Sequence, residues 1–281
     1  CHYAWDCKGY FNNCGHCPAY KSNFEHDQSR KNFVFKQHYI QKGNLIPIAG
    51  SEQHYQQLLK SSLFKDIPKY KIINSIDPKI YKPGNKNISR EKLGLPLDKK
   101  IIFFGATFHT TRRKGLKELI KALNILSISI DDNLKSNILL VSAGKSMDFI
   151  LDIDLPYKSI GFLSHEELVY AYQASDIYLS PSVEDSGPMM LRQAAMTGTP
   201  SVAFNIGNAL DFVFNGKTGH LAELYDTNDF ANGIRKILEL NKVEYEKMSQ
   251  NCRENALQIA SPEIQAKNFK NIIMKHNSQV S

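Results

Sequence analysis

The second part of the sequence predicts an α/β fold built on a doubly wound parallel sheet. From Lys99 onward, short apolar segments alternate with segments of helical character, beginning with IIFFGA and KGLKELIKALNIL. This alternation implies a parallel sheet whose two faces are covered by helices. A capping box, Ser164 to Glu167, independently marks the start of one helix. Ligands of such sheets bind at the carboxyl ends of the strands, so we expect the chemistry in the loops there.

The expected elements follow one another in chain order. Buried strands are expected in IIFFGA, NILLVSAG, DIYLSPS and SVAFNIG, which are short apolar runs bounded by turn signals. Helices are expected in KGLKELIKALNIL, HEELVYAYQAS, LRQAAMTG and FANGIRKILEL. The segment GKTGHLAE, Gly216 to Glu223, predicts a hairpin-like turn, and a final helix begins at Glu263.

The first eighty residues predict a smaller region. A short strand is expected at Leu45 to Ala49, and a helix capped at Ser51 follows it. A second strand covers Tyr70 to Ile73, and a turn at Asn74 to Pro78 leads out of the region. We place the domain boundary near Tyr81. The chain then divides into residues 1–80, 81–262 and 263–281.

One loop places two adjacent carboxylates between a strand and a helix. Glu184 and Asp185 follow the strand DIYLSPS and precede the helical run MMLRQAAM. The start of a helix offers free backbone N–H groups and a positive dipole to an anion, and carboxylates accept hydrogen bonds from sugar hydroxyls. The plain alternative is that the acids only favour the helix start.

A second loop collects positive charge after the strand IIFFG. Arg112, Arg113 and Lys114 precede an apolar helix there. Arg offers two parallel donors and Lys a point charge, which suits the negative charge of a phosphate group. A basic cap on a solvated helix is the alternative. The acidic loop in the same predicted domain favours the phosphate interpretation.

Together the two loops resemble a known family. The order of acid, Gly187, helix, GTP and SVAF is similar to the donor-sugar motif of retaining glycosyltransferases with two Rossmann-like domains, the GT-B architecture. The resemblance is family 4-like, to the colanic-acid and exopolysaccharide biosynthesis branch. It implies a nucleotide-sugar-binding domain at 81–262, preceded by the remnant of an acceptor-side domain. It also implies a C-terminal helix that crosses back to that first domain, and the start of the chain is interpreted as a truncation.

The resemblance implies three sets of binding residues. The donor-sugar set is Glu184, Asp185, Ser186 and Gly187. The phosphate set is Gly105, Arg113, Lys114, Pro188, Met189 and Met190. The nucleoside set is Gly161, Phe162, Leu163 and Gln193, with Ser142 to Lys145 expected beside it. The catalytic base of the family is expected in the missing part of the first domain, so the fragment is expected to be inactive alone.

Two positions depart from the family pattern. The family carries Glu, seven residues, then Glu, and the second position falls here on Gln193, whose amide can still bond a ribose hydroxyl. Counted by that spacing the first acid is Asp185; counted from Gly187 it is Glu184, and the sequence leaves both open. A frequent family Arg is replaced by Ala106, so Arg112 or Arg113 would take over its role.

Four of the five cysteines fall in the first seventeen residues: Cys1, Cys7, Cys14 and Cys17. Their number matches the ligands of a tetrahedral zinc site. Two disulfides and reduced loop thiols stay open as alternatives, because the upstream spacing is not that of a standard zinc finger. The family branch often has a similar segment, which implies a structural role.

Composition and charge limit the class of protein. The chain has 281 residues and 42% hydrophobic content, enough for one large domain or two ordinary ones. The sequence predicts neither a signal peptide nor a membrane span, and a cytoplasmic protein is expected. The net charge of +7 comes from scattered lysines, so no nucleic-acid partner is expected, whereas a peripheral contact with the inner membrane face stays open.

The leading hypothesis is a hexosyltransferase that moves a sugar with retention from a UDP- or GDP-linked donor to a saccharide or lipid-linked acceptor in polysaccharide biosynthesis. No cofactor is expected for catalysis, because cationic side chains and helix ends can stabilise the leaving group. One alternative is a zinc-stabilised, non-catalytic module that binds an anionic partner. Another is a nucleotide-sugar epimerase, which should need a base such as His near the acids.

Overall fold

The computed structural model describes residues 7–43, 45–106, 111–144 and 153–277. The chain forms two compact units, Cys1–Ile72 and Ile73–Ser281. The division lies upstream of the boundary expected near Tyr81, because Ile73, Ile76 and Tyr81 are buried in a core of the second unit. The segment that connects the units in the sequence therefore packs as part of the second one.

Within its described residues the first unit contains two α-helices and two short parallel strands. These are α1 (Gln28–Lys42), β1 (Ile48–Ala49), α2 (Glu52–Lys60) and β2 (Tyr70–Lys71). Asp27 caps α1 by accepting hydrogen bonds from the N–H groups of Ser29 and Arg30. Ser51 caps α2 as the sequence predicts, by accepting from the N–H of His54. Both strands are shorter than expected, since only two residues of each enter the ladder.

The second unit is built on a parallel sheet, as the sequence predicts. Within the described residues its strands follow the order β5-β4-β3-β6-β7-β8. The strands are β3 (Lys100–Ala106), β4 (Ile138–Gly144), β5 (Tyr157–Ser159), β6 (Ile177–Ser180), β7 (Ser201–Phe204) and β8 (Gly219–Ala222). The turn expected from Gly216 is present at residues 216–218, but the rest of that segment is the strand β8, whose His220 and its neighbours pair in parallel with β7 at the sheet edge.

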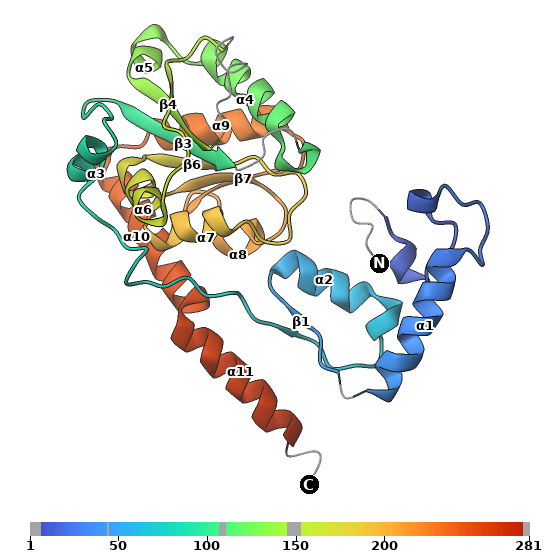
Figure 1. Ribbon diagram of the computed structural model, residues 1–281. Coiled ribbons are helices and arrows are strands. Elements are labelled where there is room, and N and C mark those ends of the chain that lie inside the picture. The colour runs from blue at the N-terminus through green and yellow to red at the C-terminus, as the bar shows by residue number, and fades with distance from the viewer. Residues whose placement is uncertain (1–6, 44, 107–110, 145–152, 278–281) are drawn as a thin grey trace. The chain divides into compact units, whose positions relative to one another are not determined.

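Helices cover both faces of this sheet (Figure 1). The helices of the second unit are α3 (Lys86–Lys92), α4 (Leu116–Ser129), α5 (Asp132–Ser136), α6 (His165–Ala174), α7 (Met189–Met196), α8 (Ala209–Phe212), α9 (Thr227–Leu238), α10 (Lys242–Ala260) and α11 (Pro262–Asn277). The capping box is confirmed: Ser164 and Glu167 exchange hydrogen bonds at the start of α6. The expected return of the last helix to the first domain remains a prediction.

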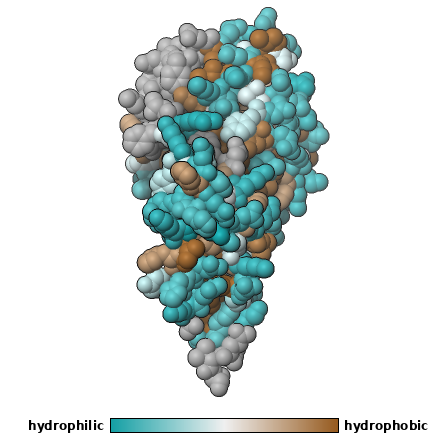
Figure 2. Space-filling model, turned by 90° about the vertical axis from the view of Figure 1, so that its right-hand side faces the viewer, coloured by the Kyte–Doolittle hydropathy of each residue, from teal (hydrophilic) through white to brown (hydrophobic). Residues whose placement is uncertain are grey.

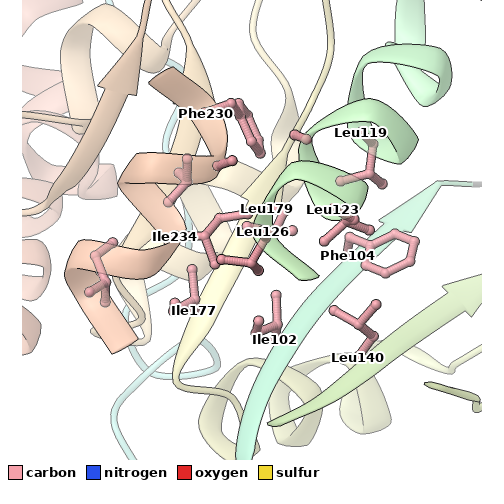
Figure 3. Packing of buried hydrophobic residues seen from close by; sticks show 14 of the residues in the cluster. Ile102, Phe104, Leu119, Leu123, Leu126, Leu140, Ile177, Leu179, Phe230 and Ile234 are labelled. Atoms are coloured by element: carbon pink, nitrogen blue, oxygen red, sulfur yellow. The ribbon is translucent and has the colours of Figure 1, made fainter. Parts of the chain in front are cut away.

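Side chains that alternate along the strands divide between two cores. Ile102 and Phe104 of β3 point to the face covered by α4 and α9, and Ile101 and Phe103 to the face covered by α6, α7, α8 and α10. Figure 3 shows Leu119, Leu123 and Leu126 of α4 and Phe230 and Ile234 of α9 converging on the strand residues of the first core. A sheet buried on both faces holds its strand ends in fixed positions.

The described helices include none that is long and apolar enough to cross a membrane. The face drawn in Figure 2 is mostly hydrophilic, with hydrophobic residues in scattered patches. A peripheral contact with a membrane stays open, as in the sequence analysis.

Candidate active site

The site lies where the strand order reverses. The chain runs from β3 outward to β4 and β5, and then returns to the other side of β3 to form β6, β7 and β8. Loops that leave β3 and β6 turn to opposite sides, so a crevice opens between their carboxyl ends. The basic loop follows β3 and the acidic loop follows β6, so both predicted loops meet at this point.

The basic loop ends in a tight turn. Arg112–Lys114 form one turn of 3-10 helix, and Gly115 follows with a φ of 68°. Glycine is required here for two reasons: this left-handed conformation strains other residues, and a Cβ would overlap the carbonyl oxygen of Pro181. The turn therefore brings the basic loop against the end of β6.

Backbone hydrogen bonds join the two loops. The N–H groups of Val183 and Glu184 both donate to the carbonyl oxygen of Arg113, at 2.9 and 3.2 Å. Gly207 supports the acidic loop from the next crossover, because a Cβ there would lie 2.5 Å from the carbonyl oxygen of Asp185. The relative position of the acids and the cations is thus fixed by the backbone.

Asp185 is paired with both predicted phosphate-binding cations. Its Oδ2 accepts from Lys114 Nζ at 2.6 Å and from Arg113 Nη1 at 3.3 Å. Its Oδ1 accepts from the N–H of Gly187 at 3.1 Å. The pKa of Tyr178 is raised, mainly because its hydroxyl group is buried. The negative charge of Asp185 is the second cause of this rise. The acidic and basic loops therefore form one electrostatic unit.

A cavity of about 380 Å³ opens beside this ion pair. All six residues of the predicted phosphate set line it: Gly105, Arg113, Lys114, Pro188, Met189 and Met190. The helix α7 begins at Met189, so the backbone N–H groups of its first turn lie at the cavity wall. Cationic side chains and a helix N-terminus at one cavity can bind and stabilise a diphosphate.

The predicted donor-sugar residues lie beside the cavity wall rather than on it. Glu184, Asp185, Ser186 and Gly187 form the bend between β6 and α7 and are not among the residues that line the cavity. The N–H of Gly187 is already bonded to Asp185, so it is not free for a phosphate. Asp185 pairs through its side chain with Arg113 and Lys114.

The structure places Gln193 in the interior instead of in the cavity. It is 4% exposed; its Nε2 donates to Tyr81 Oη at 2.7 Å, and its Oε1 accepts from Tyr172 Oη at 2.9 Å. In this position the side chain of Gln193 does not face the cavity, so it is not placed to bind a ribose there as expected. The reason is the helical period: the face of α7 that carries Gln193 packs against α6 and the sheet.

The rest of the predicted nucleoside set lies on the loop between β5 and α6. The N–H of Gly144, at the end of β4, donates to the carbonyl oxygen of Gly161 at 2.7 Å. Phe162 is 70% exposed at this carboxyl edge, whereas Leu163 packs into the core. Ser142 is buried in β4, and Lys145 lies outside the described residues. Phe162 is not among the described residues that line the cavity.

The cysteines do not form a metal site among the residues that the structure describes. Cys7, Cys14 and Cys17 are free thiols that line a second cavity, of about 430 Å³, in the first unit. Burial first, and then the neighbouring Cys7 and Cys17, raise the pKa of Cys14. No group of three His, Cys, Asp or Glu side chains within the described ranges is arranged for a metal. Cys1 lies outside these ranges, so the four-cysteine zinc site remains a prediction.

In the Asp-Ile-Asp sequence at residues 152–154, the described residues Ile153 and Asp154 do not line the cavity. Asp154 pairs at 2.7 Å with Lys135 of α5, the helix that precedes β4. This pair therefore lies toward the amino ends of the strands, the opposite edge from the cavity. Asp152 lies outside the described residues.

Some residues of the site were not found from the sequence. Thr111, Ser180, Pro181 and Ser182 line the cavity, as does Tyr178 of β6. The sequence SPS directly after a buried strand was a usable signal, because small polar residues at a strand end leave room for a ligand. Nothing in the sequence marked Gly207, whose role depends on the fold alone.

The comparisons with known proteins agree with this geometry. The profile of the family described as Glycosyl transferases group 1 matches residues 85–258. The D-inositol 3-phosphate glycosyltransferase of Corynebacterium glutamicum (strain R) is 23% identical over 254 residues, which cover 85% of this chain and 59% of that protein. The chain spans about half the length of the curated relatives it matches.

Two solved structures show the same fold. Sucrose-phosphate synthase from Thermosynechococcus elongatus has a TM-score of 0.72 and 22% identity, covering 93% of this chain and 65% of that one. Alr3699/HepE from Anabaena, in complex with UDP-glucose, has a TM-score of 0.65 and 18% identity, covering 81% of this chain and 63% of that one.

Proposed function

This chain belongs to the glycosyl transferases group 1 family, and on that premise we propose that its second unit binds the donor, a nucleotide-diphosphate sugar. In the whole protein, we propose, the sugar is transferred with retention to a saccharide or lipid-linked acceptor in polysaccharide biosynthesis. Because the chain spans about half the length of its curated relatives, no residue of this chain is assigned to acceptor binding or to the catalytic base. The same proposal places the enzyme in the cytoplasm, where nucleotide sugars are made, and at the inner membrane face if the acceptor is lipid-linked.

One observation carries the proposal: a single cavity is lined by Arg113, Lys114 and the N-terminus of α7. When the bond between the sugar and the diphosphate breaks, negative charge develops on the leaving diphosphate. Two cations and a helix dipole directed at that charge stabilise the transition state more than the ground state. The chemistry of leaving-group stabilisation is therefore supplied by side chains and backbone of this chain.

The remaining parts of the donor fit around this centre. The acids Glu184 and Asp185, next to the cavity, are proposed to bind sugar hydroxyls, and Phe162 to stack on the base. The relative Alr3699/HepE is described in complex with UDP-glucose, which supports a uridine nucleotide as the first donor to test. Relatives named D-inositol 3-phosphate glycosyltransferase support an acceptor that carries hydroxyl groups.

Calorimetric titration of the 281-residue chain with UDP and GDP tests the proposal. We expect one of the two to bind at the cavity, and Lys114→Ala to weaken that binding about 10- to 100-fold, the value of a charge-assisted hydrogen bond. Asp154→Asn is the matched control, because it removes an ion pair at the opposite edge of the sheet. Equal binding by the wild type and Lys114→Ala, or no binding of either nucleotide, would contradict the proposal.

A further inference from the structure

The carboxylate of Asp185 is held by the same kinds of donor that bind a phosphate. Lys114 and Arg113 donate to one of its oxygens, and the N–H of Gly187 donates to the other. The N–H of Gly187 lies at the entry to α7, where an anion is favoured. Two cations and a backbone N–H around one oxyanion are also the donor set expected for a diphosphate oxygen.

The acid and its cations differ in their access to solvent. The side chain of Asp185 is 11% exposed, whereas Lys114 is 27% and Arg113 47% exposed. Lys114 and Arg113 line the cavity, and Asp185 does not. An incoming anion can therefore reach the cations from the cavity side, with the carboxylate behind them.

The backbone keeps the acid in this place. The bonds from Val183 and Glu184 to the carbonyl of Arg113 join the loops, and Gly207 packs against the carbonyl of Asp185. Because these contacts involve main-chain atoms, they persist when the carboxylate changes its partner. Only the side chain of Asp185 has to rotate for an incoming anion to take its place beside the cations.

We propose that Asp185 is an internal anion that holds Lys114 and Arg113 until the diphosphate of the donor replaces it. The displaced carboxylate then accepts hydrogen bonds from the sugar of the donor. A nucleoside diphosphate without a sugar displaces the carboxylate as well but gives it no new partner. Asp185 thus selects the sugar-bearing donor over the nucleoside diphosphate product, and it assists product release. This inference rests on the proposed function and adds a specificity role to it.

The exchange predicts a coupling between Asp185 and Lys114 that is measured by UDP binding. In the full chain, Asp185→Asn is expected to tighten UDP binding about tenfold, because UDP no longer competes with an ion pair. In a Lys114→Met background, Asp185→Asn is expected to tighten UDP binding less than about threefold, because only the contact between Asp185 and Arg113 remains to be removed. The control Asp154→Asn removes the same charge far from the cavity and is expected to change UDP binding less than twofold.

A second titration with UDP-glucose tests selectivity. Asp185→Asn is expected to lower the preference for UDP-glucose over UDP about tenfold, and Asp185→Ala serves if the Asn variant does not fold. If Asp185→Asn tightens UDP binding equally in the wild-type and Lys114→Met backgrounds, Asp185 acts by general charge repulsion. That result would overturn the proposed exchange but not the proposed donor site. If neither the wild type nor the Asp185 variants bind UDP, GDP or inorganic pyrophosphate, the proposed function fails and the exchange fails with it.

Discussion

Two ion clusters at the two ends of β6 contain the same residue types and differ in their surroundings. Asp176, just before the strand, pairs with Arg90 at 2.9 Å and Lys86 at 2.7 Å. Asp185, five residues after the strand, pairs with Arg113 and Lys114. Each cluster is one Asp with one Arg and one Lys, so their composition does not distinguish them.

The cluster at the amino end is closed. Arg90 is 5% exposed and also donates to the carbonyl oxygens of Ala174 and Leu97. Asp176 accepts in addition from the N–H of Ile101. Lys86 lies over the ring of Tyr245. Protein groups enclose Arg90 and Asp176, while Lys86 is about one third exposed, so the buried Arg90–Asp176 pair fixes α3 against the sheet.

The cluster at the carboxyl end is open. Its Asp is as buried as Asp176, but Arg113 is about half exposed and faces a cavity. Cations that face a cavity can exchange one anion for another, and cations enclosed by protein cannot. The comparison teaches that the surroundings of the cations, rather than the pairing itself, separate a binding site from a structural ion pair.

The largest expected difference between the clusters is in stability. Asp176→Ala leaves the buried Arg90 without its counter-ion, and we expect the free energy of unfolding to fall by about 3–5 kcal/mol. Asp185→Ala leaves cations that water can solvate, and we expect a loss of about 1 kcal/mol or less. Urea denaturation followed by circular dichroism measures both. Equal losses would show that the carboxyl-end cluster is structural too.

The next effect concerns the turn that joins the two loops of the open cluster. Gly115→Ala combines a strained φ with overlap against Pro181, and we expect a loss of about 1–3 kcal/mol in stability together with at least tenfold weaker UDP binding. Gly216→Ala is the matched control, since Gly216 has a φ of 70° but open space around it. If both variants bind UDP equally well, the close approach of the loops is not needed for the site.

A smaller effect separates the two neighbouring arginines. Arg113 lines the cavity, and we expect Arg113→Ala to weaken UDP binding about five- to tenfold, less than Lys114→Ala because Arg113 is more exposed. Arg112 is exposed and is not among the residues that line the cavity, so Arg112→Ala is expected to change binding less than twofold. The reverse order in calorimetry would assign the phosphate to Arg112.

The smallest effect is a pH dependence of the closed cluster. Burial lowers the pKa of Lys86, and this outweighs the opposing charge of Asp176. Between that lowered value and the ordinary 10.5, the unfolded chain binds more protons than the folded one, so this group makes stability rise with pH. Between pH 8 and 10, the free energy of unfolding of the wild type should rise relative to that of Lys86→Met. The rise should be smaller than about 1 kcal/mol, since a third of the Lys86 side chain is exposed. Urea denaturation measures this difference. If the wild type and Lys86→Met differ by the same free energy of unfolding at pH 8 and at pH 10, the prediction is wrong.

The sequence predicted the elements around the site better than the contacts within it. The strands β3, β4, β6 and β7 and the capped start of α6 follow from apolar runs and local hydrogen bonding, both of which act within a few residues. The strand β8 was missed because its pairing partner, β7, determines it more than its own four residues do. The six phosphate residues were predicted from the family resemblance, and the structure brings them to one cavity because β3 and β6 end at the same edge of the sheet.

By itself, the sequence determined the parallel α/β fold, the basic loop after β3 and the acidic loop after β6, because these depend on local composition and order. Only the tertiary structure decided which acid meets the cations and where Gln193 points. The pairing of Asp185 with Lys114 spans 71 residues of sequence, and the burial of Gln193 depends on Tyr81 and Tyr172. The physical reason is that a charge or an amide takes its function from the groups around it, and packing between distant segments brings those groups together.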